Sequence, residues 1–302
     1  MRLVRPLERL DCPRISQVKL NLECRDEIVP ILRALQHVYA DAEVRGELLR
    51  VVGKDINRLH SIVWPAMLQA AELPLPRRVW AHGFVNFAGE RFSKSAGVRL
   101  DVGEAAERFG PDAFRYFLMR EVPFDTDGNF SWERFEERYE SDLANALGNL
   151  ASRSIAMVER YRGGLVPAGP RTAVDTADAT DIAAYHAALD GGRGFLLHEG
   201  LQAVWRMVAR GNEYVDRQAP WKLAKDPAQA AALDETLASL VRQLARFAVL
   251  LQPYLPGKAS ELWRQVGGRG ELSAQRFGKL LELDPTGWTV TKGEPLFPKE
   301  TP

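Results

Sequence analysis

A long amphipathic pattern runs from Trp132 to Arg162 and is followed directly by Gly163 and Gly164. Apolar side chains recur there at helical spacing, which is typical of a helix with one buried face. Paired glycines are a common helix stop because glycine adopts left-handed backbone angles at no steric cost. The pattern therefore predicts one long helix packed within a helical bundle.

From Val102 onward we expect helices only. Asp125 to Asn129 is read as a turn, and it lacks the further ligands and closing glutamate of a calcium loop. Pro, Gly, Thr and Asp residues predict a loop over 165–180. The predicted helices, besides 132–162, span residues 103–109, 112–120, 181–190, 194–216, 229–252 and 256–266.

Residues before Val102 indicate a different architecture. Val51 to Asp55 has the pattern of a short buried strand that leads into a helix, with Asp55 as its N-cap. Arg77 to His82 predicts a second strand. In open α/β sheets ligands bind at such strand ends, so this part of the chain is a candidate ligand site.

The run Arg91-Phe92-Ser93-Lys94-Ser95 follows the second strand. Two cations and two hydroxyls between glycines suit a loop that closes over phosphate groups. Taken alone, the same residues also fit an ordinary solvated turn.

Composition narrows the class of protein. The 302 residues carry 40 basic and 40 acidic side chains, so a non-specific nucleic-acid coat and DNA binding are not expected, and any RNA contact must be local. The two cysteines, Cys12 and Cys24, form no Cys-x-x-Cys pair and predict neither a disulfide framework nor a structural zinc site. No run of eighteen apolar residues and no signal core is present, so we expect a cytoplasmic protein without a membrane partner.

Several segments together resemble one family. In order and spacing they resemble the second half of the catalytic domain and the following domain of methionyl-tRNA synthetases, over about residues 51–300. The matching segments are Gly53 to Leu68, Leu73 to Gly83, the Ser-Lys-Ser loop, Asn145 to Arg153, Gln218 to Trp221 and Glu294 to Pro298.

The resemblance implies a mostly α fold with an α/β remnant. Residues 51–128 would be the C-terminal half of a Rossmann-like class I catalytic domain, and residues 129–302 an anticodon-binding helical bundle, with a tail (280–298) that folds back against the catalytic half. Residues 1–50 match no part of the family, and 25–37 faintly resemble the start of some transposases. The expectation is a synthetase truncated at its N-terminus behind an unrelated helical leader.

The resemblance also implies substrate contacts. Asp55, Ile56 and His60 would bind methionine, although the same residues read alone fit an N-cap and a core pair. Lys94 and Arg91 would stabilise charge on the departing pyrophosphate; Arg91 stands where the family commonly has lysine, and Phe92 where it has methionine. The residues implied to bind ATP are His82, Gly83, Ser93, Lys94 and Ser95.

In the bundle, Asn149, Arg153, Pro220 and Trp221 stand where the family reads the anticodon, since amide, guanidinium and indole groups suit unstacked bases. A buried, purely structural Trp221 is the alternative. The implied function is methionine–tRNA ligase, with methionine, ATP with Mg²⁺, and a tRNA with a CAU anticodon as partners, in an incomplete copy. A non-catalytic anticodon-binding fragment and a non-functional chimera remain alternatives.

Overall fold

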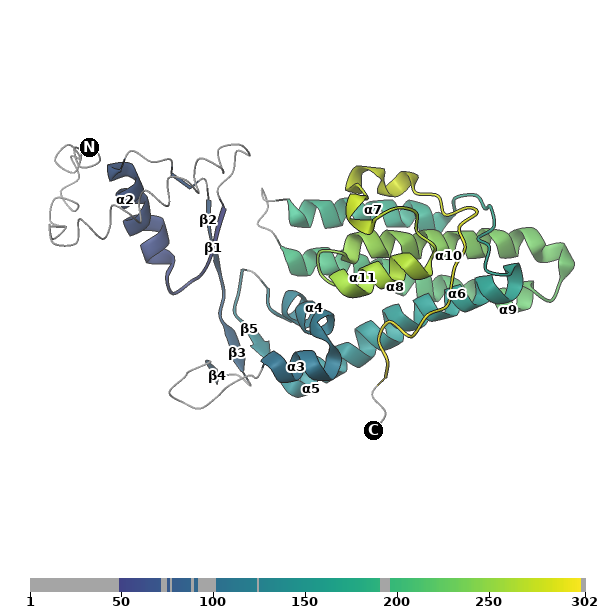
Figure 1. Cartoon of the computed structure of the whole chain (residues 1–302), viewed down its shortest axis with the longest axis horizontal. Helices are drawn as coiled ribbons and strands as arrows, with labels where there is room; N and C mark the ends of the chain where they lie inside the picture. Colours follow the sequence, from purple (N-terminus) through teal and green to yellow (C-terminus); the bar gives the residue numbers. More distant parts are fainter. Residues whose placement is uncertain are drawn as a thin grey trace. The chain divides into compact units, whose positions relative to one another are not determined.

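The computed structural model falls into two units, divided between Phe84 and Val85 (Figure 1). The residues it describes are 49–71, 75–76, 78–87, 90–91, 102–123, 125–190 and 196–299. The leader predicted over residues 1–50, including its helix from Glu27 to Leu49, lies outside them except for the backbone of Leu49 and Arg50. The predicted domain boundary near residue 128 stays a prediction.

The first unit contains the two predicted strands. β1 (Leu49–Gly53) pairs in parallel with β2 (Arg78–His82), and the register brings Gly53 opposite His82. Between them the chain forms a π-helical segment, η2 (Leu59–Val63), that continues into α2 (Trp64–Ala70). Both strand ends therefore lie at the same edge of the pair, next to the start of the helix.

The predicted N-cap at Asp55 is wrong by one residue. The first helical hydrogen bonds run from the N–H groups of Leu59 and His60 to the carbonyl of Ile56. The N–H of Ile56 donates to the Gly53 carbonyl, at 3.2 Å. Lys54 and Asp55 thus lie in a tight turn between β1 and the helix.

The second unit opens with a small sheet that the sequence did not predict. β3 (Val85–Phe87) pairs antiparallel with β4 (Glu90–Arg91) and parallel with β5 (Gly128–Phe130). The expectation of helices only from Val102, with a turn through Asn129, is therefore wrong at β5. A strand of three residues is too short to show the alternation that identifies strands.

The rest of the second unit is helical. The predicted helix over 132–162 is confirmed as a continuous helical path, although its middle ten residues are π-helical, and it ends at Gly163 with a φ of 60°. The helices are α3 (Val102–Phe109), α4 (Pro111–Glu121), α5 (Trp132–Arg138), η3 (Tyr139–Gly148), α6 (Asn149–Arg162), α7 (Ala173–Leu189), α8 (Leu197–Gln218), α9 (Pro220–Leu223), η4 (Pro227–Gln229), α10 (Ala230–Leu251), α11 (Pro256–Gln265), η5 (Leu272–Ala274) and η6 (Phe277–Glu282).

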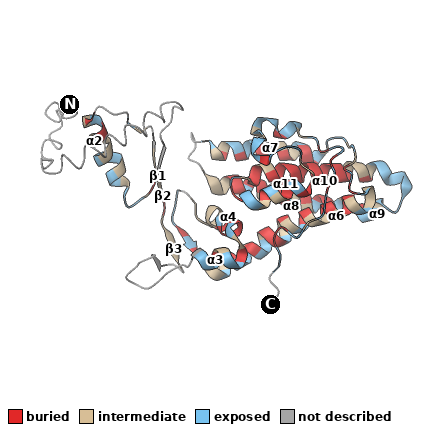
Figure 2. Cartoon of the chain, in the orientation of Figure 1, coloured by how far each residue is buried: buried red, intermediate tan, exposed pale blue. Residues whose placement is uncertain are grey.

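The core of this unit is built around α10. Nearly every residue from Thr236 to Leu251 is buried, because α6, α7, α8 and α11 all pack against this helix. Figure 2 shows the buried residues concentrated along it. A helix surrounded in this way must be apolar on all sides or must pair its polar groups internally.

The predicted loop over 165–180 is wrong from Ala173, where α7 begins. Thr172 forms a capping box: its hydroxyl accepts a hydrogen bond from the N–H of Val174 at 3.2 Å, and its own N–H donates to Asp175 at 2.8 Å. Among the threonines and aspartates that indicated a loop, Thr172 is in fact the cap of α7, and Asp175 and Asp178 are buried ion-pair partners.

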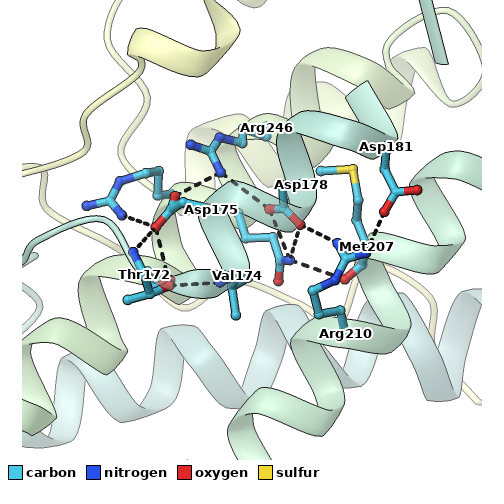
Figure 3. Close-up of polar contacts among 11 residues, drawn as sticks. Thr172, Val174, Asp175, Asp178, Asp181, Met207, Arg210 and Arg246 are labelled. Carbon is cyan, nitrogen blue, oxygen red and sulfur yellow. Dashed lines mark hydrogen bonds and ion pairs between the residues drawn. The ribbon is translucent and has the colours of Figure 1, made fainter. Parts of the chain in front are cut away.

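Three aspartates of α7 (Asp175, Asp178 and Asp181) form a buried carboxylate cluster (Figure 3). Arg246 of α10 lies 2.9 Å from Asp175 and 3.3 Å from Asp178. Arg210 of α8 donates to Asp178 at 2.7 Å and to Asp181 at 2.6 Å. The cluster therefore ties α7 to both α8 and α10.

The C-terminal tail returns along η3 and α6. Tyr139 donates to the carbonyl of Pro298 at 2.8 Å, and the N–H of Val290 donates to the carbonyl of Gly164 at 2.8 Å. The N–H of Lys292 donates to Glu159 at 2.7 Å. These contacts lie within residues 129–302, the part of the chain predicted to be the bundle.

Candidate functional site

Arg153 and Trp221 meet where α6 lies near α9. The guanidinium carbon of Arg153 is 5.9 Å from the centre of the Trp221 ring, and its Nη2 lies 3.0 Å from a carboxylate oxygen of Asp216. Trp221 is 39% exposed, so the alternative of a buried tryptophan is wrong. An exposed indole with a guanidinium beside it offers a stacking face and hydrogen-bond donors together.

Asn149 and Pro220 complete this group, which we call the α6–α9 surface (Asn149, Arg153, Asp216, Pro220 and Trp221). Asn149 is exposed and stands one helical turn before Arg153 on α6. Pro220 is buried and is the first residue of α9. The structure thus brings together, on neighbouring elements, residues that are about seventy positions apart in the sequence.

Asp216 was not among the residues predicted from sequence. It lies in the last turn of α8, and its exposed carboxylate holds the Arg153 guanidinium in place. The sequence alone does not indicate this pairing, because the partners belong to different helices whose relative position depends on the whole bundle.

Close packing below the surface fixes the position of α6. Gly211 of α8 faces α6 and α10, and a Cβ placed on it would come within 2.7 Å of a Leu150 methyl and 2.3 Å of the Gln243 side-chain oxygen. Asn212 donates to the carbonyl of Ala146 at 3.2 Å, at the end of η3. Glycine at position 211 therefore allows α8 to approach the residue that follows Asn149.

In the first unit, the residues predicted to bind methionine follow β1. Ile56 is 39% exposed, and His60 is half-buried on the same helical face. The Nδ1 atom of His60 lies 3.1 Å from the Ile56 carbonyl, which can only accept, so Nδ1 carries the proton and a neutral ring offers Nε2 as an acceptor. An apolar side chain next to an imidazole edge suits a thioether.

The strand ends place His82 and Gly83 beside this turn. The His82 Nδ1 atom lies 2.8 Å from the Gly83 carbonyl, and the N–H of Lys54 donates to the His82 carbonyl at 3.0 Å. The turn and helix that carry Asp55, Ile56 and His60 therefore begin at the same sheet edge as His82. This is the edge at which parallel strands place ligands.

The predicted phosphate loop is mostly outside the described residues. Ser93, Lys94 and Ser95 belong to the undescribed segment, and only the backbone of Arg91 is seen, in β4, where it pairs with Asn86 of β3. Within the described residues, no cluster of three or more His, Cys, Asp or Glu side chains is arranged for a metal ion, and no helix is long and apolar enough to cross a membrane.

Two family matches cover most of the chain. Residues 33–155 match the family described as tRNA synthetases class I (M), and residues 170–301 match the anticodon binding domain of methionyl tRNA ligase. The first match begins at residue 33, within the segment predicted to be an unrelated leader.

Individual relatives agree with these matches. The chain is 38% identical over 262 residues to the methionine–tRNA ligase of Caldanaerobacter subterraneus, covering 83% of this chain and 40% of the relative. It is 40% identical over 263 residues to that of Bacillus subtilis, covering 83% of this chain and 38% of the relative. The chain therefore spans about 40% of the length of these curated relatives.

A solved structure supports the same assignment. The methionyl-tRNA synthetase of Mycobacterium tuberculosis in complex with methionyl-adenylate has a TM-score of 0.76 and 36% identity to this chain, and the match covers 83% of this chain and 50% of that one. With both family matches in the expected order and this likeness in fold, the chain belongs to the methionyl-tRNA synthetase family.

Proposed function

We propose that this chain is part of a methionine–tRNA ligase and that its second unit binds the anticodon loop of methionine tRNA through the α6–α9 surface. The observation that carries the proposal is the contact between Arg153 and the exposed ring of Trp221. Asn149 lies one helical turn before Arg153 on α6. An indole stacks on an unpaired base, while amide and guanidinium groups hydrogen-bond to base edges. A CAU loop is the expected ligand.

The first unit would contribute to methionine activation. Ile56 and His60 would contact the methionine side chain, with Asp55 next to them, and His82 and Gly83 would lie on the ATP side. Lys94, helped by Arg91, Ser93 and Ser95, would follow the negative charge onto pyrophosphate when the methionine carboxylate attacks the α-phosphorus of ATP. ATP would enter as its Mg²⁺ complex, and the reaction would take place in the cytoplasm.

The test of anticodon binding is a titration of the chain with a CAU stem-loop and with the same stem carrying a changed anticodon. We expect tighter binding of CAU, and Trp221→Ala should weaken it by about 1–3 kcal/mol, the contribution of one stacked base. Trp132→Ala is not a suitable control because Trp132 packs against the Phe130 and Phe135 rings. Lys225→Ala, an exposed change four residues after Trp221, tests for non-specific charge effects.

Anticodon binding without catalysis is the second candidate, and the observation in its favour is that Arg153 and Trp221 meet within the second unit. ATP–pyrophosphate exchange with methionine separates the two functions. Exchange that Lys94→Ala reduces about a hundredfold would support the ligase, as expected for loss of a transition-state donor. Background exchange together with CAU-specific binding would leave the binding function alone.

A further inference from the structure

Ala219 has an unusual backbone conformation. Its φ of 45° and ψ of 61° make it the one non-glycine residue with a positive φ in the part of the chain that the structure describes. Residues with a Cβ atom avoid this left-handed region for steric reasons. Pro220 follows directly and restricts the preceding residue further.

This residue alone connects α8 to α9. The Ala219 N–H donates to the Val215 carbonyl at 2.9 Å and closes α8, while its carbonyl accepts hydrogen bonds from Lys222 at 2.7 Å and Leu223 at 3.3 Å and opens α9. The residue is buried. The change in direction between the helices is therefore made at a single pair of backbone angles, without a loop.

The turn determines where the indole of Trp221 lies. Trp221 is two residues beyond Ala219, and the guanidinium of Arg153, held by Asp216 at the end of α8, is 5.9 Å from its ring centre. A different φ at position 219 would carry α9 and its tryptophan away from α6.

We propose that Ala219 is a positioning residue: its left-handed backbone holds the Trp221 ring beside Arg153 before RNA binds. This inference rests on the proposed anticodon-binding function and adds to it a residue that makes no base contact. Glycine would adopt the same angles more easily, but it would also permit many others. Because an alanine before a proline has few allowed backbone angles, the turn has few other conformations once it has formed. The Trp221 ring therefore loses less conformational freedom when a base stacks on it.

The test exchanges alanine and glycine at two left-handed positions. Ala219→Gly removes the steric strain next to Trp221. Gly163→Ala is the matched control: Gly163 has a φ of 60° at the end of α6, ten residues from Arg153, and a Cβ atom placed on it would meet no other atom within 4 Å. Gly163→Ala introduces the same backbone strain at a position outside the α6–α9 surface.

We expect opposite effects on stability and on binding. Ala219→Gly should leave Tm unchanged or raised but weaken binding of the CAU stem-loop by about three- to tenfold, the cost of ordering one side chain. Gly163→Ala should lower Tm and leave the affinity for the CAU stem-loop unchanged. A large fall in Tm for Ala219→Gly, or an unaltered affinity, would overturn the proposal.

A second readout does not depend on RNA. The chain is labelled with 5-fluorotryptophan, and the ¹⁹F resonance of Trp221 is assigned by its loss in Trp221→Phe. Ala219→Gly should shift and narrow this resonance as the ring gains freedom, whereas Gly163→Ala should not. If the wild type shows no CAU preference, the proposed function fails, yet this spectrum still decides the role of Ala219: an unchanged resonance would refute it.

Discussion

Arg246 places a positive charge in the interior of the second unit, where its side chain is 1% exposed and contacts Asp175 and Asp178. Two further arginines, Arg210 and Arg242, also bind these carboxylates, so the charges of the cluster are shared. Removing Arg246 takes away a positive charge that two buried carboxylates share, and in the interior such a loss costs far more than the loss of a surface ion pair.

Arg246→Met should therefore lower the free energy of unfolding of the second unit by about 3–5 kcal/mol, although methionine fills similar space. The matched control is Arg206→Met: Arg206 pairs with Asp181 but is 52% exposed, and its loss should cost at most about 1 kcal/mol. Urea denaturation followed by circular dichroism measures both. Equal costs for the two variants would show that the buried cluster contributes no more than a surface ion pair.

At the level of single elements, the start of α7 depends on Thr172. Its capping box satisfies N–H groups that the helix cannot, and its hydroxyl also lies 3.0 Å from the Ser239 hydroxyl on α10. Because α7 carries the carboxylate cluster, the cap stabilises the first turn that positions Asp175.

We expect Thr172→Ala to destabilise the protein by about 0.5–2 kcal/mol and to increase amide hydrogen exchange in the first turn of α7. Thr180→Ala serves as control, since Thr180 is exposed on the same helix and alanine favours helix there. Unchanged exchange at residues 173–176 in Thr172→Ala would mean that the ion pairs alone hold this end of the helix.

The elements differ in how far their sequences could predict them. The helix over 132–162 has a strong apolar period and a glycine stop, and both predict it correctly. Its π-helical centre carries no such signal, and there the Ala146 carbonyl accepts a hydrogen bond from Asn212 of α8. The start of α7 was missed because threonine and aspartate favour caps and turns equally, and only the arginines of α8 and α10 decide between them.

The candidate site shows the same limit. The family resemblance indicates Asn149, Arg153 and Trp221, and the structure places the last two together. The resemblance could not indicate that Asp216 pairs with the Arg153 guanidinium. Nor could it indicate that Ala219 turns the chain, because alanine rarely adopts a positive φ. The predicted phosphate-loop residues lie outside the described part of the chain, so their role stays a prediction.

For the whole molecule, the distribution of buried apolar residues separates the two units. Among the described residues, only Val52, Leu68 and Ala71 are buried apolar residues of the first unit. The second unit, Val85–Pro302, holds one continuous core that runs from α3 to Phe297. Burial of apolar surface is the main favourable contribution to folding, so most of the stability should belong to the second unit.

We therefore expect a protein of residues 85–302 to fold alone. Its urea midpoint, followed by circular dichroism at 222 nm, should equal that of the helical transition of the full chain, because α10 and its neighbours form the core in both. It should bind the CAU stem-loop as tightly as the full chain and lose that binding in Trp221→Ala. A lower midpoint with weaker binding would show that residues before Val85 stabilise the bundle. An equal midpoint with weaker binding would instead assign part of the RNA contact to the first unit.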